Sequence, residues 1–236
     1  MSDFDRNVAA FGGAARTVAV DAGLRAHMIR VYNYMAGGVA LTGLVAYFTH
    51  QLVGPTLYAS PLMYVLIFAP LALVFFLSWR IESLAPATAR ALFFVYAALL
   101  GASLSIIFAV YTETSITRVF FISAAAFGGL SLWGYTTQRN LTGMGSFMMM
   151  GLIGIIIASL VNIFLRSSGL DWIISIVGVI VFAGLTAWDT QKIKEMYDPG
   201  DADAVSGRKA VMGALSLYLD FINLFLMLLR LFGDRR

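Results

Sequence analysis

The chain has 236 residues, of which 60% are hydrophobic and only 12% are charged, and its mean hydropathy is +0.83. Soluble domains carry about 25% charged residues, so this composition excludes an ordinary soluble domain and predicts an all-α, polytopic membrane protein. The sequence has no cysteine, which excludes disulfides, cysteine-ligated zinc and thiol catalysis. The net charge of +3 comes from basic residues scattered between apolar segments, so nucleic acid is not expected as a partner.

The first 30 residues are polar, and they contain four arginines and three aspartates. They lack a short apolar core followed by a small-residue cleavage site, so they do not have the pattern of a signal peptide. We therefore predict a polar cytoplasmic tail over residues 1–30 and a transmembrane domain over residues 31–236.

Seven apolar segments follow, and each is close to the roughly 20 residues that a helix needs to span a bilayer. They are Val31–Leu52, Ser60–Trp79, Ala91–Tyr111, Ile116–Tyr135, Gly145–Leu165, Trp172–Trp188 and Val211–Phe232. If the N-terminus is cytoplasmic, eleven of the sixteen Lys and Arg residues fall on the inner side. Basic residues concentrate on the cytoplasmic side of membrane proteins, so we expect the N-terminus inside and the C-terminus outside.

The last apolar segment carries Asp220 well inside its run of apolar residues. A carboxylate at mid-membrane costs about 2.5–3.5 kcal/mol even on lenient insertion scales, and such residues usually face protein or water and are functional. Ser216 and Asn223 lie four residues before it and three after it, which places all three on one helical face that Met227 continues. We expect this face to point inward, with Ser216 and Asn223 as polar candidates for lining a pore.

A second carboxylate, Asp189, directly follows the last residue of the sixth segment. The predicted topology brings it to the same side of the membrane as the start of the seventh segment, so it can meet Asp220 at a similar depth. Arg80, at the end of the second segment, reaches the same side and is the predicted countercharge. Two alternatives stay open, in which Asp189 is an ordinary interfacial residue and Arg80 is a topological anchor.

Three stretches carry a family resemblance: LSLYLDFINLFLMLLRLFG around Asp220, AWDTQKI around Asp189, and the middle portion from GASLSIIFAV to SLVNIFL. They resemble the Bax inhibitor-1 family of membrane proteins, and in particular its bacterial branch, over most of Arg30 to Gly233. The LYLDFINLFL run is the most specific part of the resemblance.

The resemblance implies a seven-helix fold with the C-terminal helix at the centre of the bundle, located in the bacterial inner membrane. It also implies a proton-sensitive calcium leak channel, in which Asp189 and Asp220 form a pH-sensing pair and Arg80 is the basic residue that latches it. Where some relatives have a carboxylate in the second span, this chain has the uncharged LMYVLIFAPLALVFF. That departure bears on the expected preference for calcium and leaves the aspartate pair intact.

The electrostatics of two neighbouring carboxylates suggests a function for the pair that does not depend on the family resemblance. Two neighbouring carboxylates in a poorly hydrated site cannot both be ionised at low cost, so they share a proton and can act as a pH-operated latch between helices. A path past Asp220 would suit a hard cation that prefers oxygen ligands, with calcium as a permeating ion and no cofactor. No ligand set for a resident metal is identified, because Asp198, Asp201 and Asp203 lack the spacing of a calcium-binding loop.

Two other classes of function compete with a channel. An intramembrane aspartyl protease would also use two aspartates, but LYLDFIN lacks the glycine-rich context that admits a substrate backbone, so we do not expect an enzyme. A regulator that binds a membrane protease or a stress-response partner without conducting ions stays open. The expected partners are membrane lipids, calcium or other cations and, for the regulator, a membrane protease.

Overall fold

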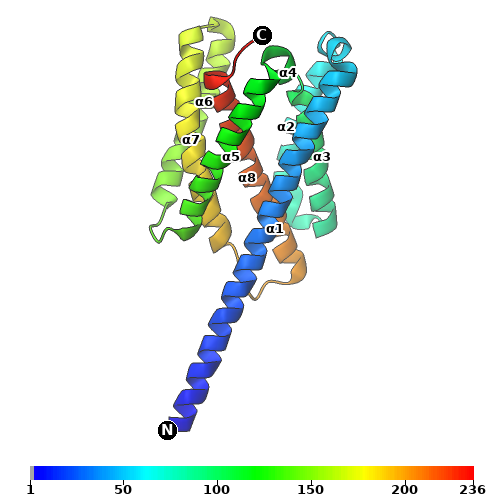
Figure 1. The fold of residues 1–236 in the computed structure, drawn as a ribbon. Coiled ribbons are helices and arrows are strands. Elements are labelled where there is room, and N and C mark those ends of the chain that lie inside the picture. The colour runs from blue at the N-terminus through cyan, green and yellow to red at the C-terminus, as the bar shows by residue number, and fades with distance from the viewer. Residues whose placement is uncertain (1–2) are drawn as a thin grey trace.

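The computed structural model describes the backbone of residues 3–236 and the side chains of residues 22–236. The chain is all-helical, as predicted, and its elements follow in the order shown in Figure 1. They are α1 (Asp3–Tyr58), α2 (Leu62–Arg80), the 3-10 helix η1 (Ile81–Ser83), α3 (Pro86–Leu104), α4 (Ile107–Val110), α5 (Glu113–Thr136), α6 (Thr142–Leu165), α7 (Ser168–Glu195) and α8 (Asp203–Phe232).

Seven helices of the described chain are long and apolar enough to cross a membrane, which confirms the predicted number of spans. Each predicted apolar segment overlaps one of these helices. The second to the seventh helix begin within about two helical turns of the predicted start. The first helix is the exception, because α1 runs without a break from Asp3 to Tyr58. No change of secondary structure marks residue 30, so the division into tail and domain stays a prediction, and the side chains of residues 1–21 lie outside the described part.

The two chain ends lie at opposite ends of the bundle (Figure 1). The N-terminal part of α1 extends away from the other helices at one end, and residues 233–236 lie at the other. An odd number of spans requires this arrangement. Which end faces the cytoplasm stays a prediction from the distribution of basic residues.

The C-terminal helix is the centre of the fold, as the resemblance implied. In the most apolar stretch of α8, 72% of the residues are buried, whereas in that of α6 only 11% are. The helix α8 packs against α1, α3, α5 and α7. Tyr218 of α8 is completely buried, and its hydroxyl lies 2.6 Å from Oγ1 of Thr42 on α1. The peripheral helix α6 instead exposes large apolar side chains such as Phe147 and Phe164, which is the pattern of a surface that faces lipid.

Helices approach closely where glycines remove the side chain. A Cβ atom on Gly134 of α5 would overlap the backbone carbonyl of Ala187 on α7, and one on Gly145 of α6 would overlap the ring of Trp188. Small residues at these positions let neighbouring backbones pack in lipid, where the hydrophobic effect contributes little to association. The two glycines therefore hold α5 and α6 tightly against the end of α7 that carries Asp189.

The segment after α7 contacts α1 through an aromatic pair. The rings of His27 and Tyr197 lie 5.8 Å apart between centroids, and Tyr197 occupies the space that the missing side chain of Gly23 leaves on α1. His27 is 4% exposed, and within the described chain neither of its ring nitrogens has a hydrogen-bond partner. A buried polar group without a partner costs about 1–3 kcal/mol, so this histidine does not stabilise the contact through its nitrogens.

We therefore expect His27→Leu to raise the free energy of unfolding by about 1 kcal/mol, measured from thermal unfolding of the helices in detergent. His50→Leu is the matched control, because Nδ1 of His50 lies 3.0 Å from the hydroxyl of Tyr58 and that hydrogen bond would be lost. The control variant should lower the midpoint of unfolding. If His27→Leu lowers it as much as His50→Leu does, the imidazole nitrogens have partners that this account lacks.

Candidate functional site

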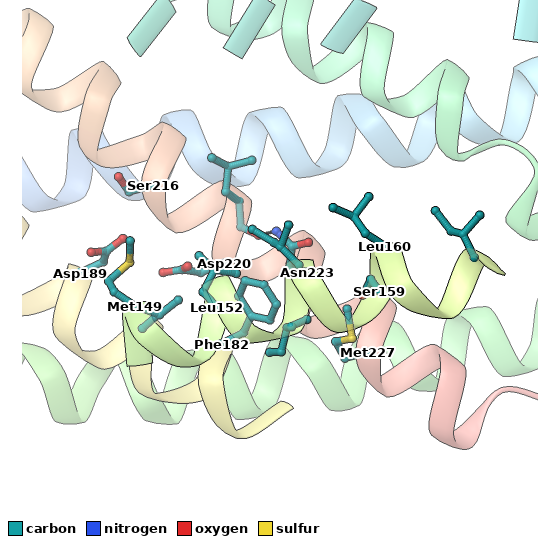
Figure 2. A pocket seen from close by; sticks show the side chains of 15 residues that line it. Met149, Leu152, Ser159, Leu160, Phe182, Asp189, Ser216, Asp220, Asn223 and Met227 are labelled. Atoms are coloured by element: carbon teal, nitrogen blue, oxygen red, sulfur yellow. Dashed lines mark hydrogen bonds between the residues drawn. The ribbon is translucent and has the colours of Figure 1, made fainter. Parts of the chain in front are cut away.

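The two predicted carboxylates meet between α7 and α8, which are packed closely along their length. Asp220 is 5% exposed and Asp189 is partly buried. Their carboxyl groups are within hydrogen-bonding reach of one another and point toward each other in Figure 2. Oδ2 of Asp220 has no donor partner within the described chain. This is expected of a carboxyl whose neighbour is another carboxyl, because a hydrogen bond between the two requires a proton on one of them.

The inward face predicted for α8 lines a cavity of about 530 Å³ (Figure 2). Ser216, Asp220, Asn223 and Met227 all contribute to its wall, so the predicted helical stripe points inward as a whole. The opposite wall comes mainly from α6, which supplies apolar side chains and Ser159. We call this space the central cavity. Its polar lining consists of the two aspartates, two serines and Asn223.

A second cavity, which we call the vestibule, has a volume of about 790 Å³ and lies where η1, the end of α7 and the start of α8 come together. Asp189 and Ser216 line both the vestibule and the central cavity. The two spaces therefore adjoin at Asp189, one member of the aspartate pair. The vestibule, at the end of the bundle, has the more polar lining, and the central cavity has the more apolar one.

A third cavity, of about 490 Å³, lies at the other end of α6 and α7, and we call it the far cavity. Ser159 and Ile163 line both the far cavity and the central cavity. Arg166, Asp171 and Arg230 provide its charged side chains. The vestibule, the central cavity and the far cavity thus follow one another along α7 and α8 from one end of the bundle toward the other.

The charges around the vestibule are mixed. Its lining includes three cationic residues, Lys192, Arg208 and Lys209, together with Glu82 and Asp189. Lys209 is paired with Asp201 at 2.6 Å. Lys192, one helical turn beyond Asp189 on α7, is the cation whose charge acts on the Asp189 carboxyl. The i, i+3 spacing of Asp189 and Lys192 is visible in the sequence and could have identified this neighbour.

Arg80, the predicted countercharge, is not brought to the pair. Its side chain is exposed at the end of α2, and among the described residues it forms no ion pair with either aspartate. The segment next to it does line the vestibule, through Glu82 and its neighbours. A long basic side chain at the end of a membrane helix reaches toward water, which explains its exposure. The latch role of Arg80 stays a prediction, and Lys192 is the cation near the pair in this structure.

The fold and the buried site together define a class of protein: a seven-helix membrane protein with a carboxyl pair between its sixth and its central seventh span. Residues 24–236 match the family described as Bax1-I, inhibitor of apoptosis-promoting Bax1, and the chain belongs to this Bax inhibitor-1 family.

Individual relatives match the chain over almost all of its length. The inner membrane protein YbhL of Escherichia coli K12 is 49% identical over 220 residues, which cover 91% of this chain and 94% of the relative. A protein of Rickettsia prowazekii is 51% identical over 220 residues, covering 92% of each chain. A protein of Caulobacter vibrioides is 44% identical over 249 residues and covers both chains completely. The resemblance inferred from the LYLDFINLFL run is therefore confirmed.

Proposed function

We propose that the protein is a pH-sensitive leak channel for calcium or another hard cation, gated by Asp189 and Asp220. The observation that carries this proposal is that Asp189 lines both the vestibule and the central cavity, while Asp220 lines the central cavity next to it, so an ion passing between these spaces would pass the two carboxyls. Carboxylate, hydroxyl and amide oxygens are the ligands that hard cations prefer. Asp220, Ser216 and Asn223 offer one of each kind along α8.

The proposed path follows the three adjoining cavities. The cavities adjoin at shared residues, which are Asp189 and Ser216 at one boundary and Ser159 and Ile163 at the other. A leak needs weak binding at successive points, because an ion that binds too tightly does not leave. The Asp189 carboxyl at one boundary, with Asp220 next to it in the central cavity, and the Ser159 hydroxyl at the other are consistent with such weak, separated binding points.

The proposed gate is the shared proton. When one proton is held between Asp189 and Asp220, the carboxyls attract each other and hold α7 against α8. Removal of that proton at higher pH leaves two adjacent negative charges in a poorly hydrated place, where repulsion is strong. The repulsion separates the two helices at the boundary and makes the site attractive to a cation. We therefore expect conduction to rise with pH.

The proposed location is a bacterial inner membrane, with the vestibule on the cytoplasmic side. The name of the Escherichia coli relative, inner membrane protein YbhL, supports this membrane, and the concentration of basic residues at the vestibule end supports the orientation. We propose no enzymatic activity, because the sequence around Asp220 lacks the glycine-rich context of an intramembrane aspartyl protease.

Purified protein in liposomes that contain a calcium-sensitive dye tests the proposal. We expect calcium influx that increases between about pH 6 and pH 8, since the shared proton is lost as pH rises. Liposomes without protein provide the leak of the bilayer itself. Influx equal to that of empty liposomes at every pH would count against a channel.

One observation favours a second candidate, a regulator that does not conduct ions. Lys192, Arg208 and Lys209 line the vestibule, and positive charge at a mouth opposes the approach of cations. The same charges would suit an acidic segment of a membrane protease or of another stress-response partner. This candidate predicts silent liposomes, together with recovery of a membrane protease when the intact protein is captured from native membranes. Replacement of Arg208 by Glu should then abolish that recovery.

A further inference from the structure

An apolar cavity of about 560 Å³ lies in the half of the bundle that holds the C-terminus, on the side of α8 away from the aspartate pair. Its walls come from α1, the end of α3, α4, α5 and α8. Aromatic and aliphatic side chains dominate the lining, including Tyr47, Phe108, Phe120, Phe221 and Phe225. Nothing in the proposed conduction path uses this space.

The cavity reaches the surface between α1 and α5. Figure 1 shows α1 and α5 in front of α8 with α8 running between and behind them, and residues of all three helices line the cavity. Gly43 of α1 belongs to the lining, and a Cβ atom added there would meet no other atom within 4 Å. Its neighbour Leu44 is 58% exposed, as expected for a helix that faces lipid.

The contents of such a space follow from its lining. Apolar cavities do not hold ordered water, because water needs polar partners. An empty cavity is also unfavourable, because the side chains around it lose dispersion contacts. The helices that frame the opening are membrane spans, so the molecules at the opening are acyl chains of the bilayer.

The rim of the cavity adds a contact for a charged headgroup. Glu113 lines the cavity at the start of α5, and its carboxylate lies 3.7 Å from the guanidinium of Arg236. Arg236 is held at this place by its backbone, since its N–H donates to the carbonyl of Val110 at 3.0 Å. The guanidinium is about half exposed, and it has donors left for a phosphate besides Glu113.

We propose that a phospholipid of the surrounding bilayer binds here, with one acyl chain inserted between α1 and α5 against α8 and its phosphate at Arg236. The bound chain packs against Phe221, Ile222 and Phe225, which protein side chains otherwise bury almost completely. It thereby completes the packing of the central helix on the face opposite Asp220. This binding site is separate from the proposed conduction path and does not depend on it.

Photochemical labelling tests the site in the intact protein. The probe is a phosphatidylglycerol with a diazirine halfway along one acyl chain, in proteoliposomes, and the labelled residues are located by mass spectrometry of peptides. We expect labelling of α8 at Phe221 to Phe225, although α8 is the most buried helix, and we expect loss of that labelling in Gly43→Phe, which fills the cavity. Gly128→Phe, at an open position on α5, is the matched control and should keep the α8 labelling.

Absence of α8 labelling in the unmodified protein would overturn the proposal, and so would equal α8 labelling in Gly43→Phe. If Gly43→Phe fails to fold, Gly43→Leu fills part of the same space and should reduce the labelling. A diacylglycerol with the same diazirine chain lacks the phosphate and should label α8 less than phosphatidylglycerol does. Equal labelling by the two probes would overturn the contact with Arg236.

Discussion

Asp220→Asn should abolish the pH dependence of calcium influx into proteoliposomes while the protein still folds. An asparagine has nearly the same shape as an aspartate but cannot be ionised, so the pair with Asp189 no longer gains or loses a shared proton. Asp220 is 5% exposed, and replacing a buried carboxyl by an amide of the same size leaves the packing of α8 in place. The measurement is influx at several values between about pH 6 and pH 8.

Asp171→Asn is the matched control for this prediction. Asp171 also lines one of the three adjoining cavities, but that cavity is the far cavity. There its Oδ1 accepts a hydrogen bond from Nδ2 of Asn162 at 2.7 Å. The pH dependence of influx should persist in this variant. A pH response that survives Asp220→Asn unchanged would show that the gate titrates elsewhere.

Gly134→Val should destabilise the bundle more than any other substitution considered. The Cβ atom would overlap the backbone carbonyl of Ala187, which cannot move aside as a flexible side chain can. Overpacking of a tight interface costs about 1–3 kcal/mol, and the displacement would fall on the part of α7 next to Asp189. We expect a lower midpoint of thermal unfolding in detergent.

Gly128→Val is the control for the steric argument, because Gly128 lies on the same helix and has no atom within 4 Å of an added Cβ. The same change of residue type should leave the midpoint nearly unchanged there. Equal midpoints for the two variants would contradict the close approach of α5 and α7.

The number of spans could be predicted from the composition of the sequence, and the central position of the last helix from the family resemblance. Length and apolar composition are enough to identify a membrane helix, since a bilayer has one thickness and each span must satisfy its backbone internally. The inward face of α8 followed from the cost of placing Asp220 in lipid. Helical spacing then brought Ser216 and Asn223 to the same cavity, where the structure has them.

Other features of the site depend on packing that helical periodicity does not contain. Arg80 was expected beside the pair because topology brings the end of α2 to the same side, but topology fixes a depth and not the direction of a side chain. The helix α6 contributes Ser159 and its apolar neighbours to the central cavity. This contribution depends on how α6 packs against α7. The unbroken first helix also was not expected, because polar residues at a membrane surface form helices as readily as loops do.

If Asp189 and Asp220 hold one proton between them near neutral pH, infrared spectroscopy of the protein in a bilayer should detect it. We expect a carboxylic acid C=O band that is present in the unmodified protein at about pH 7, decreases as pH rises, and is absent from Asp189→Asn/Asp220→Asn. No such band in the unmodified protein at that pH, or an equal band in the double variant, would show that the two carboxyls do not share a proton.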